Sequence, residues 1–504
     1  MNGTAESNLN HSSRSPPLSL NILTLNCWGL KYLATLRNQR LLEISHRIAT
    51  TVPAPHIVGL QECWTQEDYL AIRRLTRDIL PYAKFYHSGI FGGGLAILSA
   101  FPIIESSMVR YPLNGRPTAF FRGDWFVGKG VACASIRLPP VGGKGEGEVV
   151  EVFTTHLHAP YEGEPNDSYL CHRTAQAWEI AKLMRGAAER GHLTIGLGDF
   201  NMVPLSLAHQ LIEAHAPVRD IWRVLHPESS LGPTDHPQER ARKRPMPSSR
   251  FNLEENGATC DSALNTWRWS KQMQKQLSKG EDIQVSLDSS DPGAKRLDYI
   301  FFGNGTNTPA PWHVESARVG MTERHSSLGC SLSDHFSVEA TLSRSPTSNP
   351  SPPPPPLPTS TYTHILSLIA TYTTRERHQR RFRLANFVVS VFVSLGCWTA
   401  IWWSPRPFVS FLLTVLSTLG FGAGVVDGLI GGLFMSSEIR ALKEFEWEIE
   451  NARARAEERE RGGQEVEAKG EVGDRTDRRR SRERHGGFVA DSGGMEQGNN
   501  RDAF

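Results

Sequence analysis

The chain has 504 residues, with 55 Lys and Arg against 53 Asp and Glu, a formal net charge of +2 and 39% hydrophobic residues. This length excludes a minimal module, and the balanced charge gives no support for a nucleic-acid binder held by bulk positive charge. The 7 cysteines form no CxxC pair, and their odd number argues against a closed disulfide framework.

The first 18 residues lack the basic start, apolar run and cleavage site of a signal peptide, and we expect them to be disordered. Residues 19–342 then read as one mixed α/β unit. Short apolar runs bounded by turn residues predict buried strands: NILTLNCW, HIVGLQE, GLAILSA, GVACASI, VVEVFTTHLH, LTIGLGDFN, RLDYIFF and FSVEATL. Helical spacing between them, as in LRNQRLLEISHRIAT and CHRTAQAWEIAKLMRGAAER, indicates a layered α/β architecture with polar strand ends at one rim.

Residues 227–295 are rich in charge, Ser and Pro, and we expect an insertion or long loops there. After residue 342 the composition changes to SRSPTSNPSPPPPPLPTS. A proline run of this kind favours an extended, semi-rigid segment, so residues 343–374 are predicted to be a linker.

Two long apolar runs follow, at about 384–403 and 408–435, with only SPRP between them. Because ~20 helical residues cover the ~30 Å hydrocarbon core of a bilayer, we expect a basic flank and a transmembrane hairpin within residues 375–437. A hairpin buried in a large soluble core is the alternative. The turn holds only Arg406, whereas a group of arginines precedes the first run: Arg375, Arg377, Arg380, Arg381 and Arg383.

This arginine bias places both long flanks of the hairpin in the cytosol, and the same side chains would attract anionic lipid headgroups. Asp427 is the one charge in the second run; at the midplane it would cost ~2.5–3.5 kcal/mol, which favours a position near an interface. Residues 438–504 are dense in Glu and Arg and then rich in Gly, so we expect a short charged helix followed by disorder.

Polar residues stand where the predicted strands of residues 19–342 stop. Each alone is typical of a solvated strand cap, but their number and order indicate one site: Asn26, Glu62, His156, Asp199, Asn201, Asp298, Asp334 and His335. Hydrolysis of a phosphodiester at neutral pH needs a divalent cation, a base that deprotonates water and hydrogen-bond donors around phosphorus. Oxygen ligands suit Mg²⁺, with Mn²⁺ as a substitute.

The order of these residues resembles the endonuclease/exonuclease/phosphatase superfamily over about residues 19–342. The resemblance implies a four-layer α/β sandwich with the hairpin following it. It also implies that Glu62 is the metal carboxylate, with Asn26 beside it holding metal or phosphate and Asp334 near the metal. Asp199 and Asn201 would orient the attacking water and a phosphate oxygen.

On the other side of the implied site, His335 would be the general base, oriented by Asp298, and His156 would stabilise phosphate charge in the transition state. A carboxylate partner raises the basicity of an imidazole and fixes its tautomer, which agrees with that role. His158 stands where bacterial members usually have Gln, and it would contact the headgroup or bond locally.

The segment GDWFVGKG lacks the final Ser or Thr of a nucleotide P-loop, because Gly130 stands there. It resembles instead the Asp-x4-Lys signature of neutral sphingomyelinases, carried by Asp124 and Lys129, which implies a regulatory loop; a structural ion pair on a turn is the alternative. Together with NCWGLKYL, LQECW, HSGIFGGGLAILSAFPI, TTHLHAPY, LGDFNMVP and GATCDSALNTW, it is similar to the fungal inositol phosphosphingolipid phospholipase C group.

This resemblance implies a Mg²⁺-dependent phospholipase C that cleaves inositol phosphosphingolipids or sphingomyelin to ceramide and a phosphorylated headgroup. The enzyme would be a multi-pass protein of the endoplasmic reticulum or mitochondrial membrane, with the catalytic domain and tail facing the cytosol. An anionic phospholipid would be an activator, and no nucleic-acid partner is expected.

Three alternatives stay open at this point. One is a membrane-tethered nuclease, although the sequence shows no evident basic groove. Another is an inositol polyphosphate phosphatase, which is disfavoured because RLDYIFF stands where that branch has a WCDR-type segment. The third is a membrane scaffold without catalytic activity.

Overall fold

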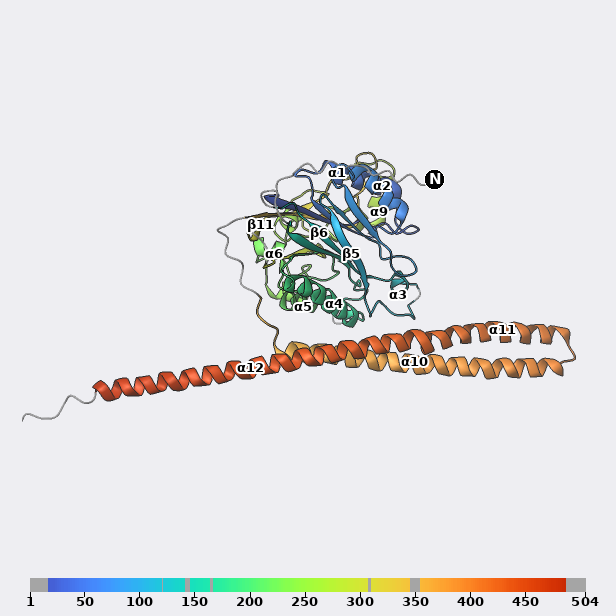
Figure 1. Cartoon of the computed structure of the whole chain (residues 1–504). Coiled ribbons are helices and arrows are strands. Elements are labelled where there is room, and N and C mark those ends of the chain that lie inside the picture. Colours follow the sequence, from blue (N-terminus) through green and yellow to red (C-terminus); the bar gives the residue numbers. More distant parts are fainter. Residues whose placement is uncertain are drawn as a thin grey trace, which may run out of the picture.

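A computed structural model describes residues 17–119, 121–140, 146–163, 166–306, 310–344 and 354–485, with side chains up to residue 462 (Figure 1). The expected disorder of residues 1–18 and of the end of the tail therefore falls almost wholly outside the described residues, as does the middle of the proline run.

In the part of the chain that the structure describes, twelve strands form two six-stranded mixed sheets. The first sheet has the order β11 (Trp312–Gly320), β12 (Ser337–Arg344), β1 (Ser19–Asn26), β2 (Ile57–Gln61), β4 (Leu95–Ser99), β3 (Tyr82–Tyr86). The second has the order β5 (Ile103–Arg110), β6 (Gly130–Arg137), β7 (Val149–His156), β8 (Leu193–Asp199), β10 (Asp298–Gly303), β9 (Arg219–Asp220).

The two sheets face each other across a core of branched aliphatic side chains from strands that are buried on both faces, such as β2 and β8. Helices α1 (Arg37–Thr50) and α2 (Gln66–Thr76) cover the first sheet, and α4 (Leu170–Glu189) and α5 (Leu207–His215) cover the second (Figure 1). The expected four-layer α/β sandwich is thus confirmed.

Several connections between the strands of the sandwich contain short helices. Helix α3 (Asp124–Val127) follows β5, and α6 (Ile221–Leu225) follows β9. The segment expected to be an insertion carries α7 (Pro237–Ala241), α8 (Ser249–Glu254), a 3-10 turn (Thr266–Arg268) and α9 (Lys271–Ser278).

The C-terminal part consists of α10 (Thr359–Trp402), α11 (Pro407–Leu429), a π-helical segment (Ile430–Phe434) and α12 (Met435–His485). Two of its helical stretches, Thr359–Trp402 and Pro407–Gly462, are long and apolar enough to cross a membrane. Only 11% of each apolar window is buried, which argues against a hairpin hidden in a soluble core. Asp427 forms an ion pair with Arg383 and accepts a hydrogen bond from Asn386, so this charge is neutralised near the end of α11, away from the turn between α10 and α11.

Two boundaries differ from the sequence-based expectation. The linker is shorter than 343–374, because α10 already begins at Thr359, and α12 is a long helix that includes residues expected to be a disordered tail. The reason is packing on the outer faces of α4 and α5, which buries one side of each helix: Tyr362, Ile365, Ile369 and Tyr372 on α10, and Leu442, Phe445, Ile449, Ala452 and Ala456 on α12.

Candidate active site

The topology of the sandwich brings the polar strand ends to one rim. Strands β1 and β2 run parallel, as do β7 and β8, so the carboxyl ends of these four strands point the same way in each sheet. His156 at the end of β7 is the register partner of Asp199 at the end of β8, and Asp298 at the start of the antiparallel β10 also pairs with Asp199. Parallel and antiparallel pairing therefore place three predicted residues side by side.

Asn26 joins the two sheets at this rim. Its Nδ2 donates to Oε1 of Glu62 at 3.2 Å and to Oδ2 of Asp199 at 3.0 Å, while its Oδ1 accepts from the backbone N–H of Trp28 at 3.0 Å. In this arrangement the amide group is a donor between two carboxylates, and its oxygen is used by the backbone.

Two rim residues have left-handed backbones, with φ of 54° at Glu62 and 45° at Asn201. Such conformations cost free energy in residues other than glycine and persist only where the surroundings fix them. The carbonyl of Glu62 accepts from Gly29 N–H at 3.0 Å, and the N–H of Asn201 donates to Oδ1 of Asp199 at 2.9 Å. These bonds aim both side chains into the site.

His335 and Asp298 form a buried hydrogen-bonded pair, with 2.8 Å between Nδ1 and Oδ2. The other ring nitrogen of His335, Nε2, lies 3.9 Å from Oδ2 of Asp199. Burial opposes a charge on this ring, but the neighbouring carboxylates Asp298 and Asp199 outweigh it and hold the pKa of His335 well above its usual range. The ring is thus oriented by one carboxylate and faces a second.

His156 also lies beside Asp199, with 3.5 Å between its Nε2 and Oδ2 of Asp199. Burial first, and then the positive charge of Lys129, hold the pKa of His156 well below its usual range. Its Nδ1 is buried without a hydrogen-bond partner among the described protein atoms. A neutral imidazole with a free ring nitrogen is suited to donate or accept at a ligand.

Three carboxyl groups crowd this rim. Burial raises the pKa of Glu62, and Asp334 raises it further; burial also raises the pKa values of Asp199 and Asp334. Such a cluster of oxygen donors fits a divalent cation, which would remove the repulsion between the negative charges. Ligand atoms of Asp199, Asp298 and His335 also lie within 4.8 Å of one another, but Nδ1 of His335 already bonds Asp298. The oxygen-rich side at Glu62 fits Mg²⁺ better.

Lys129 reaches the same rim from the loop after β5. Its Nζ donates to the carbonyl of Leu157 at 3.0 Å, and Nδ2 of Asn201 donates to the same oxygen at 3.1 Å. Asp124 lies one step further out, with 3.8 Å between its Oδ1 and Nζ of Lys129. The two residues of the Asp-x4-Lys signature are thus brought together, but only the lysine contacts the central group.

Two residues hold Asp124: Tyr161, which sequence reasoning missed, and His158, which it named without finding this partner. Tyr161 OH donates to Oδ2 of Asp124 at 2.6 Å, and Nε2 of His158 lies 3.5 Å from the same oxygen. The ring of His158 is buried and stacks on Tyr169, with 4.0 Å between centroids, so His158 is a local partner of the loop. The motif TTHLHAPY contains both His158 and Tyr161, and this is the signal that could have found them.

Ser333 is a further residue that the pattern did not indicate. Its Oγ donates to the backbone carbonyl of Asn26 at 2.6 Å and accepts from the N–H of His335 at 3.2 Å. Ser333 therefore ties the segment before β12 to the end of β1, which fixes His335 relative to Asn26.

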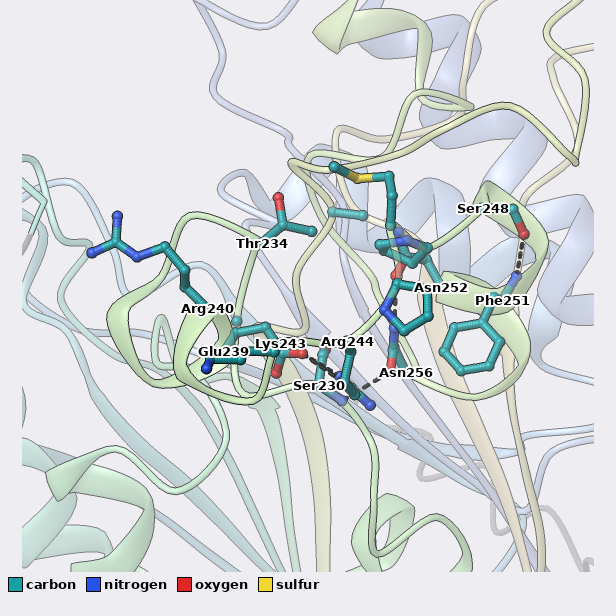
Figure 2. A pocket seen from close by; sticks show the side chains of 15 residues that line it. Ser230, Thr234, Glu239, Arg240, Lys243, Arg244, Ser248, Phe251, Asn252 and Asn256 are labelled. Atoms are coloured by element: carbon teal, nitrogen blue, oxygen red, sulfur yellow. Dashed lines mark hydrogen bonds and ion pairs between the residues drawn. The ribbon is translucent and has the colours of Figure 1, made fainter.

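A separate cavity of about 620 Å³ lies within the insertion (Figure 2). Arg240, Lys243, Met246 and Phe251 are among its lining residues, and Arg244 pairs there with Glu239. None of the strand-end residues lines this cavity, so it is not the pocket of the rim site.

Comparison with known proteins agrees with this architecture. The model of the endonuclease/exonuclease/phosphatase family matches residues 23–335, and the chain belongs to this family. The inositol phosphosphingolipids phospholipase C of Schizosaccharomyces pombe is 40% identical over 431 residues, which are 85% of this chain and 93% of that protein. The protein of the same name from Saccharomyces cerevisiae is 32% identical over 497 residues, 90% of this chain and 93% of that protein. Human sphingomyelin phosphodiesterase 2 is 34% identical over 205 residues, 41% of this chain and 46% of that protein.

Proposed function

We propose that this protein is a Mg²⁺-dependent phospholipase C that hydrolyses phosphosphingolipids to ceramide and a phosphorylated headgroup. The observation that carries the proposal is the 40% identity across 93% of the fission-yeast inositol phosphosphingolipids phospholipase C. The convergence of acids, amides and imidazoles at one rim supplies the groups that this reaction requires.

In the proposed mechanism His335 accepts a proton from the attacking water at Nε2 while Asp298 holds its Nδ1. The water oxygen forms a bond to phosphorus, and the bond from phosphorus to the ceramide oxygen breaks. This oxygen takes a proton from a solvent water molecule and leaves as the alcohol, and His335 returns the proton that it accepted to the solvent. Asp199 and Asn201 orient the water and a phosphate oxygen.

His156 and Lys129 lie at the same rim, and they would donate hydrogen bonds to the phosphate oxygens. Nδ2 of Asn26 already donates to Glu62 and Asp199, so this residue would hold the two carboxylates in place. The carboxylates of Glu62 and Asp334 would hold the cation. When bound there, a divalent cation would neutralise charge on the phosphate and would oppose protonation of His335.

The apolar hairpin of α10 and α11 would anchor the enzyme in a bilayer of the endoplasmic reticulum or of mitochondria. The arginines at the start of the spans favour a cytosolic position for the catalytic domain and α12. Both flanks of a hairpin lie on one side of the membrane, so the active site would act on the leaflet that faces the cytosol.

A substrate panel tests the proposal directly. Full-length protein with Mg²⁺ is assayed against inositol phosphosphingolipid, sphingomyelin, DNA and a phosphoinositide. We expect ceramide release from one or both sphingolipids and none of the other activities. Cleavage of DNA or loss of a phosphoinositide phosphate without ceramide release would instead support the nuclease or the phosphatase, and no turnover at all would support a scaffold.

The Asp-x4-Lys loop gives a prediction about regulation. We expect anionic phospholipid vesicles to raise the rate, and Lys129→Ala to abolish turnover while the protein stays inserted in the membrane. Lys275, an exposed lysine on α9, provides the matched control variant Lys275→Ala. Equal rates with anionic and zwitterionic vesicles, or an active Lys129→Ala variant, would contradict this role.

A further inference from the structure

Two loops beside the rim site expose large apolar side chains. Strands β3 and β5 run in the same direction as β2 and β7, so the described residues of the loops that follow them, 87–94, 111–119 and 121–129, emerge at the rim that carries Glu62. Ile90 is 72% exposed, Phe91 is 63% exposed and Phe121 is fully exposed. Exposed apolar groups that cluster on one face indicate an interaction surface.

The two loops form one protrusion, which we define as residues 87–94 and 121–128. The N–H of Ile90 donates to the carbonyl of Phe126 at 3.0 Å, and Ser88 Oγ donates to the carbonyl of Gly128 at 2.7 Å. Gly89 and Gly128 pack backbone to backbone, and a Cβ on Gly128 would lie 2.5 Å from Cα of Gly89. The protrusion therefore presents its apolar tips from a fixed base.

A row of aromatic rings connects this protrusion to the membrane hairpin. The ring of Trp125 lies 4.5 Å from that of Phe434 in the π-helical segment, and 5.1 Å from that of Phe126. Phe126 in turn lies 6.3 Å from Phe91. Figure 1 shows that α10 and α11 extend beyond the catalytic domain on the side where α3 lies. The exposed tips are thus on the side of the domain from which the spans leave.

The position of the two apolar spans sets how far the contact between Trp125 and Phe434 lies from the hydrocarbon core of the bilayer. The pair Arg383 and Asp427 neutralises the charge nearest the apolar windows, which places the hydrocarbon boundary close to it. Phe434 lies two helical turns further out, roughly 10 Å at 1.5 Å per residue. The headgroup layer is about 5–8 Å thick on each side of the hydrocarbon core, so Trp125 stands at the outer surface of this layer.

We propose that the protrusion is a second membrane contact, in which Ile90, Phe91 and Phe121 enter the interfacial layer of the same bilayer that holds the hairpin. Aromatic and aliphatic side chains on a rigid base are suited to this layer. The hairpin fixes the domain at the membrane, and the protrusion turns the rim that carries Glu62 toward the lipid. The occupant of the apolar surface is a bilayer, not a second protein.

Site-specific labelling tests the proposal in the full-length protein. The native cysteines are all buried, so a cysteine introduced at an exposed position takes up an environment-sensitive fluorophore selectively. Phe91→Cys and Phe121→Cys place the label on the protrusion. Leu18→Cys, 79% exposed at the opposite end of β1, is the matched control.

In phosphatidylcholine liposomes with headgroup-region spin-labelled lipid, labels at 91 and 121 should be blue-shifted and quenched at least three-fold more than the label at 18. Equal quenching at all three positions overturns the proposal. A blue shift at positions 91 and 121 that appears only when a second copy of the chain binds there also overturns it. This readout does not depend on turnover, so it stands or falls separately from the proposed function.

A second measurement rests on the proposed function. The double variant Ile90→Ser and Phe91→Ser should release ceramide from bilayer substrate at least ten-fold more slowly, while its rate on detergent-dispersed short-chain substrate stays within two-fold of the parent. Equal losses on both substrates would indicate damage to the fold and would contradict a role in membrane contact. Absence of activity in the parent protein would count against the proposed function alone.

Discussion

The ionised carboxyl groups of Glu62, Asp199 and Asp334 lower the free energy of unfolding. A cation bound between them would remove this destabilisation. Burial raises the pKa values of all three groups, and a neighbouring carboxyl group adds to the rise at Glu62, where it is Asp334, and at Asp199, where it is Asp298. The ionised cluster therefore lowers the stability of the fold. A protein that keeps such a cluster gains stability when a cation binds the native state and not the unfolded chain.

Metal binding should therefore be visible as stability. We expect Mg²⁺ to raise the thermal unfolding midpoint of the catalytic domain; at 100 times the Kd the gain is about 2.7 kcal/mol. Glu62→Gln should unfold no earlier than the parent without metal, but should lose the shift. Glu105→Gln, at an exposed position on β5, should keep it, and calorimetry of each variant with Mg²⁺ and with EDTA makes the comparison.

His335 gives the second residue-scale prediction. In the proposed mechanism this imidazole is the base for the attacking water, so His335→Ala should lower kcat/KM by about 10²–10⁴ while far-ultraviolet circular dichroism is unchanged. His46→Ala, an exposed histidine on α1, is the control and should retain the parent rate. Comparable activity of the two variants would remove His335 from the mechanism.

Much of the rim could be predicted from the sequence, because each strand ends in a polar residue and parallel strands share an edge. What the pattern did not contain was orientation. Asn26 was expected to hold metal or phosphate, but which way its amide points depends on Trp28, Glu62 and Asp199 together. The partners of Asp124 likewise depend on how a loop folds back on β7.

At the scale of elements, the predicted strands were those that are buried. The four strands that were not predicted, β3, β5, β9 and β11, all lie at sheet edges. Most residues of β5 and β11 are half-buried or exposed, and β9 has only two residues. An edge strand with mixed polarity gives a weak alternation signal. The helices α1 and α4 were found from their apolar spacing.

Docking of α12 on α4 was missed, although the sequence carries a signal for it. Leu442, Phe445, Ile449, Ala452 and Ala456 follow one another at alternating intervals of three and four residues within a stretch rich in Glu and Arg. Such spacing indicates a helix with one packed face. Composition alone suggested a mostly disordered tail because the charged residues of this stretch outnumber the apolar residues of the packed face.

The docked helices bury two acids, and this predicts a dependence on pH. Tyr372 OH donates to Oε1 of Glu438 at 2.6 Å, and Nε2 of His172 lies 3.2 Å from the same oxygen. Burial raises the pKa of Glu438 to about 7, and burial with the charge of Glu438 raises the pKa of Glu376 to about 7. Arg116 and Arg375 also face this cluster and lower both values.

Because the docked pKa values exceed the usual value of 4.5, protonation stabilises docking. The stabilisation is complete below about pH 4.5 and is lost as the pH rises through about 7. We expect faster amide exchange in residues 438–456 at pH 8 than at pH 6, after correction for intrinsic rates. Glu438→Gln should flatten this dependence, whereas the exposed Glu450→Gln should not; equal protection at both pH values would contradict the assignment.

At the scale of the whole molecule, the proposed membrane hairpin would place both of its flanks on one side of a membrane. In proteoliposomes of uniform orientation, a protease added outside should cut the catalytic domain and α12 together or spare them together. A cysteine at Ser404, in the turn between the spans, should react with an impermeant reagent only from the opposite side. Cleavage of one flank without the other would exclude a hairpin.

The length of α10 has a further consequence. One continuous helix of 44 residues, about 66 Å at 1.5 Å per residue, runs from the contact with α4 and α5 through the first span. A flexible linker would let the domain move over a wide area of the membrane, but a stiff helix holds the domain over a small area. For the proposed membrane-anchored phospholipase, substrate would then arrive by lateral diffusion, and the rate should follow the mole fraction of sphingolipid in the surrounding leaflet rather than its total amount in the sample.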